Sequence, residues 1–303
     1  MKVVVIVVTF NGSKWVNKCF GSIEKSSIPV SVLAIDNCST DNTVSLIKNN
    51  FTSVELIQTG ENIGFGKANN IGLKKALQNH ADYVFLLNQD ASVEIDTIEL
   101  LVNNADQNKS FGILSPLHIL PNNDKLEWYF STYITPDKCP NLYSDMYFNK
   151  LENIYEVQFV NAAAWLITKK CLQEVGGFDP LFPHYGEDED YCERTKYKKY
   201  KIGVVPSAKI FHDITYKSWD DIKFNVQRQL IFSFIELKKI KLSFKFALFN
   251  YTKNRIDKLV FLFFTLQWKE FFFMTKILLK SYKYIFEIKN SRKISKENLS
   301  YLK

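Results

Sequence analysis

The stretch YVFLLNQDAS, residues 83–92, decides how the chain is expected to fold. Five apolar residues run directly into Asn88, Gln89 and Asp90, with no glycine or proline to mark an ordinary turn. One interpretation is a helix that begins here, because Asp90 or Ser92 could cap its first turn. The other is a buried strand whose carboxyl end presents a metal and diphosphate site. The segments on either side separate the two interpretations.

Short apolar runs alternate with helix-like segments along the first part of the chain. The apolar runs cover residues 3–10, 31–36, 54–59 and 83–88, and the helix-like segments cover residues 13–25, 41–49 and 66–79. Strands that alternate with short helices predict βαβ units and a mostly parallel sheet with both faces covered. Ligands of such sheets bind at the carboxyl ends of the strands, so the residues there are the candidates for a site.

Polar residues follow four of the predicted strands. They are Thr9 and Asn11, Asp36 and Asn37, Asn62 and Gly64, and Asn88 and Asp90. Each pair alone has an ordinary explanation as a helix cap or a turn. Together they would line one crevice at the edge of the sheet. A nicotinamide cofactor is not expected, because the Gly64-x-Gly66 segment lacks the third glycine of the dinucleotide fingerprint, and the sequence contains no P-loop motif.

Composition and cysteine usage fit a globular chain in a reducing compartment. The 303 residues are 46% hydrophobic and 15% aromatic, enough to bury the core of one or two domains. The five cysteines are scattered and form no CxxC pair, which argues against a disulfide framework and a structural zinc site. The initial run MKVVVIVVTF has one lysine and no small-residue cleavage site, so we expect a strand rather than a signal peptide.

The charge is divided near residue 215. Residues 1–215 carry a net charge of −5 and residues 216–303 a net charge of +12. The basic excess predicts an anionic partner, either nucleic acid or an acidic membrane surface. Nucleic acid is not expected, because the aromatic residues there lie in apolar runs without an RNP-like or helix-turn-helix signature. We therefore divide the chain into a first domain, residues 1–215, and a helical, aromatic and basic region, residues 216–303.

The run LVFLFFTLQWKEFFFMTKILLK, residues 259–280, is the most apolar part of this basic region. Two lysines and a glutamate interrupt it, so it is not expected to span a bilayer. Taken as one helix, it places four polar side chains on a narrow stripe and leaves a broad apolar face. The four are Thr265, Lys269, Lys276 and Lys280. Such a helix could lie on an anionic membrane, pack on the first domain or form a homodimer.

Several motifs in order resemble one enzyme family. They are TFN (9–11), DNCSTDNT (36–43), ENIGFGKANNIG (61–72), LLNQDA (86–91), the segment from Phe159 to Arg194 with GGFD and GEDED, and VPSAKIFHD (205–213). Over about residues 3–213 the chain resembles the GT-A type glycosyltransferases of family 2, above all the rhamnosyltransferase-like bacterial members. The resemblance implies an α/β fold of the GT-A class, with a Rossmann-like, mostly parallel sheet flanked by helices.

The resemblance also implies a nucleotide-sugar donor, with dTDP-rhamnose first and UDP-galactofuranose or another UDP-hexose behind it. Asp36 would accept a hydrogen bond from the pyrimidine base, near Thr9 and Asn11, while Asn62, Gly64 and Asn70 would shape the pocket floor. The residues implied in donor binding are Thr9, Asn11, Asp36, Asn37, Asn62, Gly64, Asn70, Asn88 and Asp90.

A divalent cation, Mg²⁺ or Mn²⁺, is implied at the end of the stretch quoted first. Asp90 stands in the place of the last acid of the family's DxD motif, and Asn88 replaces the first acid. One carboxylate can suffice for a hard cation when substrate phosphates complete its ligands. His212 is the second candidate ligand, and an imidazole ligand would favour Mn²⁺. The alternative for His212 is a buried histidine that bonds to a backbone carbonyl.

The acidic segment YGEDEDYCER, residues 185–194, is the candidate for general-base chemistry. Acids are favoured at a helix start, but four in a row repel one another, which raises the pKa of at least one. Transfer with inversion needs one carboxylate to deprotonate the acceptor, and the motif match assigns Asp188, supported by Glu187. Asp190 and Arg194 would orient the segment or bind the acceptor. The acceptor-binding candidates are Trp165, His184, Tyr185, Asp190 and Arg194.

These expectations combine into an inverting glycosyltransferase that moves a sugar, rhamnose first, to a saccharide acceptor. The resemblance implies a lipid-diphosphate-linked acceptor, bacterial surface polysaccharide synthesis such as O-antigen or capsule, and a cytoplasmic enzyme peripheral to the inner face of the cell membrane. A sugar nucleotidyltransferase is the alternative from another class. Its glycine-rich start with an arginine and a Pro-Lys pair is missing here.

Overall fold

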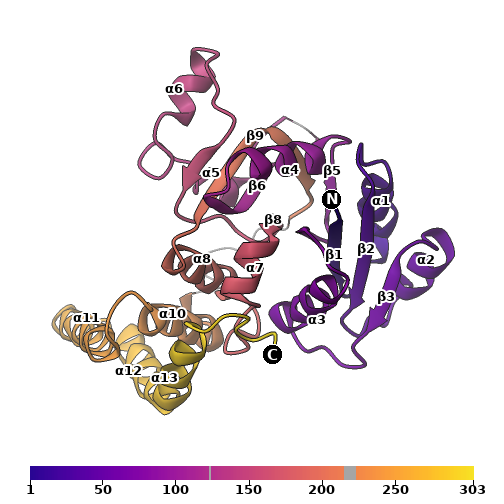
Figure 1. The fold of residues 1–303 in the computed structure, drawn as a ribbon. Helices are drawn as coiled ribbons and strands as arrows, with labels where there is room; N and C mark the ends of the chain where they lie inside the picture. Colours follow the sequence, from indigo (N-terminus) through magenta and orange to yellow (C-terminus); the bar gives the residue numbers. More distant parts are fainter. Residues whose placement is uncertain (123, 215–222) are drawn as a thin grey trace.

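The computed structural model describes residues 1–122, 124–214 and 223–303, and within them it holds a nine-stranded sheet covered by helices (Figure 1). The strands follow the order β3-β2-β1-β4-β8-β6-β9-β5, with β7 paired to β9. The strands are β1 (Val3–Thr9), β2 (Val30–Asp36), β3 (Glu55–Gln58), β4 (Tyr83–Asn88), β5 (Ala91–Val93), β6 (Phe111–Ile119), β7 (Tyr155–Val157), β8 (Ala164–Thr168) and β9 (Lys201–His212). The helices are α1 (Ser13–Glu24), α2 (Thr43–Asn50), α3 (Phe65–Gln78), α4 (Thr97–Gln107), α5 (Trp128–Ser131), α6 (Leu142–Tyr147), α7 (Lys169–Val175), α8 (Glu187–Tyr197), α10 (Val226–Lys238), α11 (Phe244–Phe264), α12 (Trp268–Lys283) and α13 (Ile285–Ile294).

The mostly parallel α/β sheet expected from the sequence is confirmed. Strands β3, β2, β1 and β4 are parallel neighbours; three lie within the apolar runs that predicted them, and β2 begins one residue before its run. Side chains of β1 point alternately into two cores: Val4 and Ile6 enter one, while Val3, Val5 and Val7 enter the other. An apolar run without alternation is therefore what this position requires, because helices cover both faces of the strand.

The sheet departs from the parallel pattern beyond β4. β8 lies antiparallel between β4 and β6, and β6 and β9 are again parallel to each other. The helix considered after Asp90 does not form. Instead the short strand β5 pairs antiparallel with the end of β9, in a register that places Ala91 opposite His212. The chain thus turns sharply at Asp90 and brings two distant segments to the same edge of the sheet.

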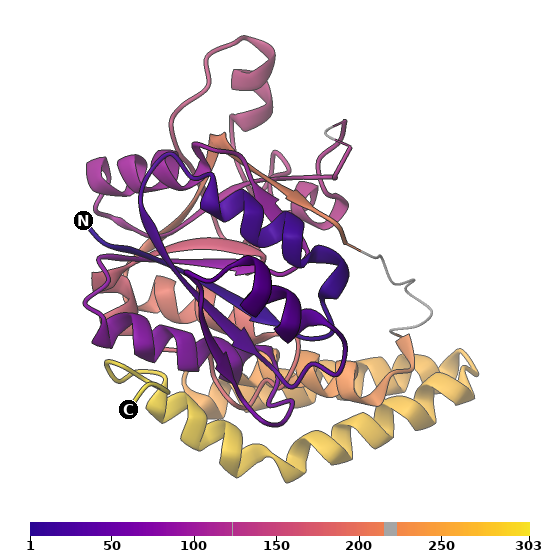
Figure 2. The ribbon, with the colours of Figure 1, turned by 90° about the vertical axis from the view of Figure 1, so that its right-hand side faces the viewer.

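The C-terminal region is helical, as expected, and lies along one side of the sheet domain (Figure 2). The predicted boundary at residues 215 and 216 lies outside the described residues. The run 259–280 is not one helix: it is divided between α11 and α12 by a turn in which Leu266 has a φ of 56°. Among the described residues, none of the helices is both long and apolar enough to cross a bilayer.

A buried ionic cluster joins the C-terminal helices to the sheet domain. Lys238 of α10 contacts Asp179 and lies 2.7 Å from Asp190 of α8. Arg194 bonds to the other oxygen of Asp190, also at 2.7 Å. All four side chains are buried and their formal charges cancel, so each charge keeps a partner away from water. The helical region is therefore fixed to the sheet domain rather than tethered loosely to it.

Candidate active site

The polar ends of β1 and β2 are bonded to each other. The Asp36 carboxylate accepts bonds from the Thr9 hydroxyl (3.0 Å) and from the backbone N–H and the hydroxyl of Ser39 (3.0 and 2.5 Å). Asn11 lies beside them and accepts the backbone N–H of Thr40 at 2.8 Å. Asp36 is fully buried in this arrangement. A bond from a pyrimidine base to Asp36 stays a prediction.

The loop after β3 is fastened to the same edge. The Asn37 amide donates to the Asn62 side chain at 2.9 Å and accepts the backbone N–H of Ile63 at 2.9 Å. Gly64 follows with a φ of +87°, and a Cβ atom there would overlap the backbone carbonyl of Pro183. The glycine is thus required by both its backbone angle and the close approach of another loop. The predicted donor residues Asn37, Asn62 and Gly64 therefore shape one continuous surface.

The quoted stretch sends its polar side chains in two directions. Gln89 forms two bonds with the backbone of Phe10: its carbonyl accepts the N–H at 2.9 Å and its amide donates to the C=O at 3.0 Å. Its neighbours Asn88 and Asp90 instead line a pocket. The turn at Gln89 and Asp90, between β4 and β5, accounts for the division, because it points neighbouring side chains in different directions. Gln89 therefore holds this strand end against Phe10, while Asn88 and Asp90 face the pocket.

Asp90 and His212 come together as predicted for metal ligands. Asp90 Oδ1 lies 3.4 Å from His212 Nε2, longer than an ordinary hydrogen bond. His212 is buried, and its Nδ1 has no hydrogen-bond partner among the described residues. A carboxylate oxygen with an imidazole nitrogen is a donor set that suits Mn²⁺ and, less well, Mg²⁺. The residues present therefore fit a divalent cation.

His212 is also part of a buried group that the sequence did not reveal. Ligand atoms of His118, Glu127 and His212 lie within 4.8 Å of one another. Glu127 already accepts the backbone N–H groups of Tyr129 and Phe130 at 2.7 and 3.0 Å, which caps α5. Burial, with a smaller contribution from His212, lowers the pKa of His118 well below its usual value. The Nδ1 atoms of His118 and His212 have no hydrogen-bond partner among the described residues, so this group is a second set of side chains that could hold a cation together with His212.

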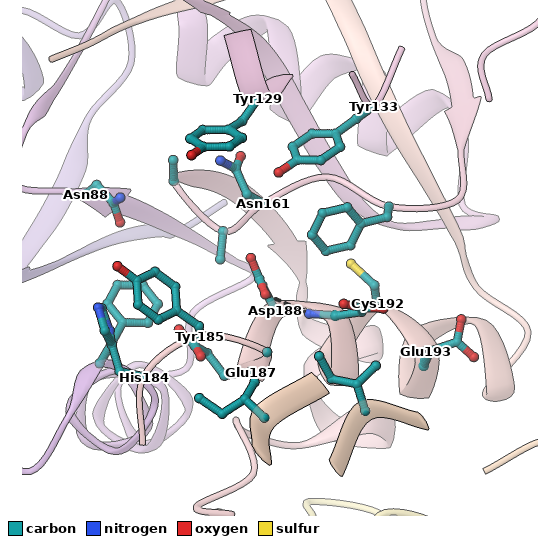
Figure 3. Close-up of a pocket in the computed structure, with 18 of the residues that line it drawn as sticks. Asn88, Tyr129, Tyr133, Asn161, His184, Tyr185, Glu187, Asp188, Cys192 and Glu193 are labelled. Atoms are coloured by element: carbon teal, nitrogen blue, oxygen red, sulfur yellow. Dashed lines mark hydrogen bonds between the residues drawn. The ribbon is translucent and has the colours of Figure 1, made fainter. Parts of the chain in front are cut away.

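The pocket beside these residues has a volume of about 830 Å³. It runs from Asn88 and Asp90 to the start of α8. Figure 3 shows the Asp188 carboxylate pointing toward Asn161, with Tyr129 and Tyr133 beyond it. Of the predicted residues, the pocket brings together Asn88, Asp90, His184, Tyr185, Glu187, Asp188 and His212. A metal site and an acidic site therefore face a single cavity.

Two carboxyl groups in the first turn of α8, those of Glu187 and Asp188, have raised pKa values. Burial raises the pKa of Glu187, and the neighbouring charge of Asp188 raises it further. Burial also raises the pKa of Asp188, against the bond it accepts from the Glu189 backbone N–H at 2.8 Å and the charge of Arg228. A carboxylate with a raised pKa is a stronger base than one in water. The geometry and the acid strength of Asp188 both suit proton abstraction.

Three predicted acceptor contacts are corrected by their burial. Trp165 is fully buried and packs between Phe178 and Tyr191 in the core. Asp190 and Arg194 form the ionic cluster with Lys238, and their side chains do not line the pocket. Their role is to orient α8, the alternative that the sequence left open for both.

Asn70 and Arg228 differ from what the sequence indicated. The Asn70 side chain bonds twice to the backbone of Phe178, at 2.8 and 2.7 Å, so it shapes the floor by holding the GGFD turn. Arg228 of α10 lines the pocket and stacks on the Tyr185 ring. Nothing in its sequence surroundings distinguishes Arg228 beyond its being an arginine in a lysine-rich region. Tyr129 of α5 and Tyr133 just after it also line the pocket, and no motif in the sequence around them indicated this.

Comparison with known proteins agrees with this geometry. The family model described as Glycosyl transferase family 2 matches residues 4–175. The N-acetylglucosaminyl-diphospho-decaprenol L-rhamnosyltransferase of Mycobacterium tuberculosis is 25% identical over 236 residues, covering 69% of this chain and 75% of that protein. The dTDP-rhamnosyl transferase RfbF of Shigella flexneri is 26% identical over 166 residues, 54% of each chain.

A solved structure supports the fold. The mannosyltransferase PcManGT from Pyrobaculum calidifontis, in complex with GDP-Man and Mn²⁺, aligns with a TM-score of 0.58 at 16% identity. The alignment covers 93% of this chain and 75% of that chain, so it extends past the sheet into the C-terminal helices. At this identity the likeness concerns the fold alone.

Proposed function

The chain belongs to glycosyl transferase family 2, and we propose that it transfers rhamnose from dTDP-rhamnose to a lipid-linked saccharide with inversion. It is a glycosyltransferase of the GT-A fold, by its family, its relatives and its sheet. The observation that carries the proposed mechanism is the single pocket that holds Asp90 and His212 at one end and Asp188 at the other. Rhamnose is the first choice because two relatives are named for its transfer.

The donor would lie across the strand ends, with its diphosphate toward Asp90. Asp90 and His212 would hold a divalent cation, which would supply Lewis-acid stabilisation of the negative charge on the leaving diphosphate. Gln89 fixes the position of Asp90 through its two bonds to Phe10. The pairing of β5 with the end of β9 sets His212 beside Asp90. The site is therefore preorganised for the leaving group before the donor binds.

Asp188 would act on the acceptor. Its carboxylate takes the proton of the acceptor hydroxyl as that oxygen forms a bond to the anomeric carbon. The bond from the anomeric carbon to the diphosphate oxygen breaks, and its electron pair leaves with the nucleoside diphosphate. Arg228 limits how far the pKa of Asp188 rises, and the raised pKa of Glu187 favours its neutral form beside the base. One base and one displacement invert the anomeric centre.

A lipid-diphosphate acceptor is proposed from the relatives and from the pocket wall. The Mycobacterium tuberculosis relative is named for a diphospho-decaprenol acceptor. In this chain, α10 contributes Ile231, Phe232 and Ile235 to the pocket beside Arg228, which gives an apolar wall next to a cation. We place the reaction in bacterial surface polysaccharide synthesis, at the inner face of the cell membrane.

A donor panel tests the proposal. The purified chain with Mn²⁺ is given dTDP-rhamnose, UDP-galactofuranose and UDP-hexoses, with and without a polyprenyl-diphosphate-linked saccharide. We expect release of dTDP from dTDP-rhamnose that increases with acceptor. Release of UDP from a UDP-sugar, without release of dTDP from dTDP-rhamnose, would show that the donor is a UDP-sugar instead. Pyrophosphate formed from a nucleoside triphosphate and a sugar phosphate would contradict the reaction class and favour a nucleotidyltransferase.

A further inference from the structure

Helix α11 places its bulky apolar residues on the side opposite its buried face. It buries Ala247, Tyr251 and Leu262. Its large exposed apolar residues recur at spacings that share another face of the helix. Those on this face are Phe246, Phe249, Ile256, Val260, Phe263 and Phe264, while Phe261 is exposed to one side of them. A helix that only packed on its neighbours would have the reverse arrangement, with its bulky residues inside.

Helix α12 repeats the pattern. Its buried positions are Ile277 and Ser281, while its exposed stripe holds Trp268, Phe272, Leu279 and Tyr282. The two stripes meet at the turn between the helices, where the rings of Phe263 and Trp268 are 5.3 Å apart. We name Phe264, Leu266 and Phe272 the aromatic tip. Their exposed fractions are 78%, 69% and 65%, values that leave most of each side chain in water.

Lysines flank this apolar surface. Lys276 and Lys283 are exposed on α12, about two turns apart and beside its apolar stripe. Lys253 is exposed within the stripe of α11. The region from residue 216 onward carries a net charge of +12. Lysine and aromatic side chains together are the composition of helices that lie in the interface of an anionic membrane.

We propose that the outward surface of α11 and α12 docks on an anionic lipid bilayer and inserts the aromatic tip among the headgroups. The charges favour lipid over a second copy of the chain, because two copies would bring their lysine-rich surfaces together. The reason for docking rests on the proposed function, since a lipid-linked acceptor resides in that bilayer. Helix α10 packs on α11 and α12 and also lines the catalytic pocket. Docking would therefore set the pocket at a fixed height above the membrane.

Vesicle flotation of the full chain tests the surface. The vesicles are phosphatidylcholine with or without phosphatidylglycerol, in salt of about 0.15 M. We expect binding to the anionic vesicles and a loss of at least about ten-fold for Phe264→Ser/Leu266→Ser/Phe272→Ser. Lys276→Glu/Lys283→Glu should also lose binding and depend less on salt. Tyr147→Ser/Phe148→Ser, at exposed residues in and just after α6, is the matched control and should bind like the wild type.

Each result of these experiments either supports or overturns the membrane-docking proposal. The proposal is overturned if the wild-type protein does not bind anionic vesicles, or if the tip variant binds them as well as the wild type does. A dimer in light scattering that the tip variant converts to a monomer would assign the surface to a second copy instead. Thermal unfolding shows whether the variants remain folded. Donor hydrolysis without vesicles separates the two proposals, because the tip variant should keep it, and vesicle binding without any hydrolysis would count against the enzyme assignment alone.

Discussion

The carboxylate of Asp90 lies 3.4 Å from Nε2 of His212, and the two residues meet because β5 pairs with the end of β9. The register that sets Ala91 opposite His212 fixes the distance between the two ligands through backbone hydrogen bonds. The backbone N–H of Asp213 adds a bond to the carbonyl of Asp90 at 2.9 Å. The proposed metal site is thus set by the pairing of β5 with β9.

Loss of either ligand should weaken cation-dependent nucleotide binding. We expect Asp90→Asn and His212→Ala each to raise the Mn²⁺ concentration needed for nucleotide binding at least about ten-fold. The measurement is a Mn²⁺ titration of the thermal shift caused by dTDP. His80→Asn, at an exposed histidine far from the pocket, is the control and should match the wild type. If the midpoints of the Mn²⁺ titration in both variants equal that of the wild type, the cation does not bind at Asp90 and His212.

Arg228 should control the pH range in which Asp188 works. Its positive charge opposes the burial that raises the pKa of Asp188, so Arg228→Gln should raise that pKa further. A base acts only when ionised, and therefore activity should be lost at a higher pH on the acid side than in the wild type. The measurement is the pH dependence of kcat/KM, in which the acid limb is the range where activity falls as the pH is lowered. Lys245→Gln, at an exposed lysine of α11, should leave it in place, and a limb that moves down would refute the assignment.

Lys238 should be essential for stability. Lys238→Met leaves the buried carboxylates of Asp179 and Asp190 with one cation fewer, which typically costs about 3–5 kcal/mol. The free energy of unfolding from urea denaturation measures the loss. Lys239→Met changes the adjacent, exposed lysine and should alter stability little. Equal effects of the two substitutions would mean that the ionic cluster does not hold the C-terminal helices.

Gly64 should tolerate no side chain. Gly64→Ala places a methyl group against the Pro183 carbonyl at a positive φ, which should cost about 1–3 kcal/mol and weaken nucleotide binding. Gly21→Ala is the matched control, because no atom lies within 4 Å of its added methyl group. In the middle of α1 that change should stabilise the protein by about 0.5–1 kcal/mol. Nucleotide affinity unaffected by Gly64→Ala would show that the loop contact is dispensable.

Sequence patterns were sufficient where local rules decide the structure. The apolar runs of β1 and β4 lie on a sheet covered on both faces, so their periodicity and the helices between them specify the parallel half. The same rules located the strand ends, including Asp90. They failed just beyond it, because the three-residue strand β5 is too short to carry a pattern of its own and exists through its pairing with β9.

The sequence also could not predict the directions in which the side chains of a helix point. Asp190 and Asp188 are two residues apart on one helix turn, yet one enters the ionic cluster and the other faces the pocket. Their order in the acidic run does not reveal this, since it depends on how α8 is rotated against α10. Arg228 was missed for a related reason: its place in the pocket follows from the packing of a helix distant in sequence.

The most direct test of the account is the activity of Asp188→Asn beside its nucleotide affinity. Calorimetry gives the affinity for dTDP with Mn²⁺, and dTDP release in the presence of acceptor gives the turnover. Glu24→Gln, at an exposed carboxylate at the end of α1 that does not line the pocket, is the control. The account predicts a loss of turnover of at least about 100-fold for Asp188→Asn, with nucleotide affinity unchanged and the control active. An Asp188→Asn enzyme that keeps most of its turnover would contradict it.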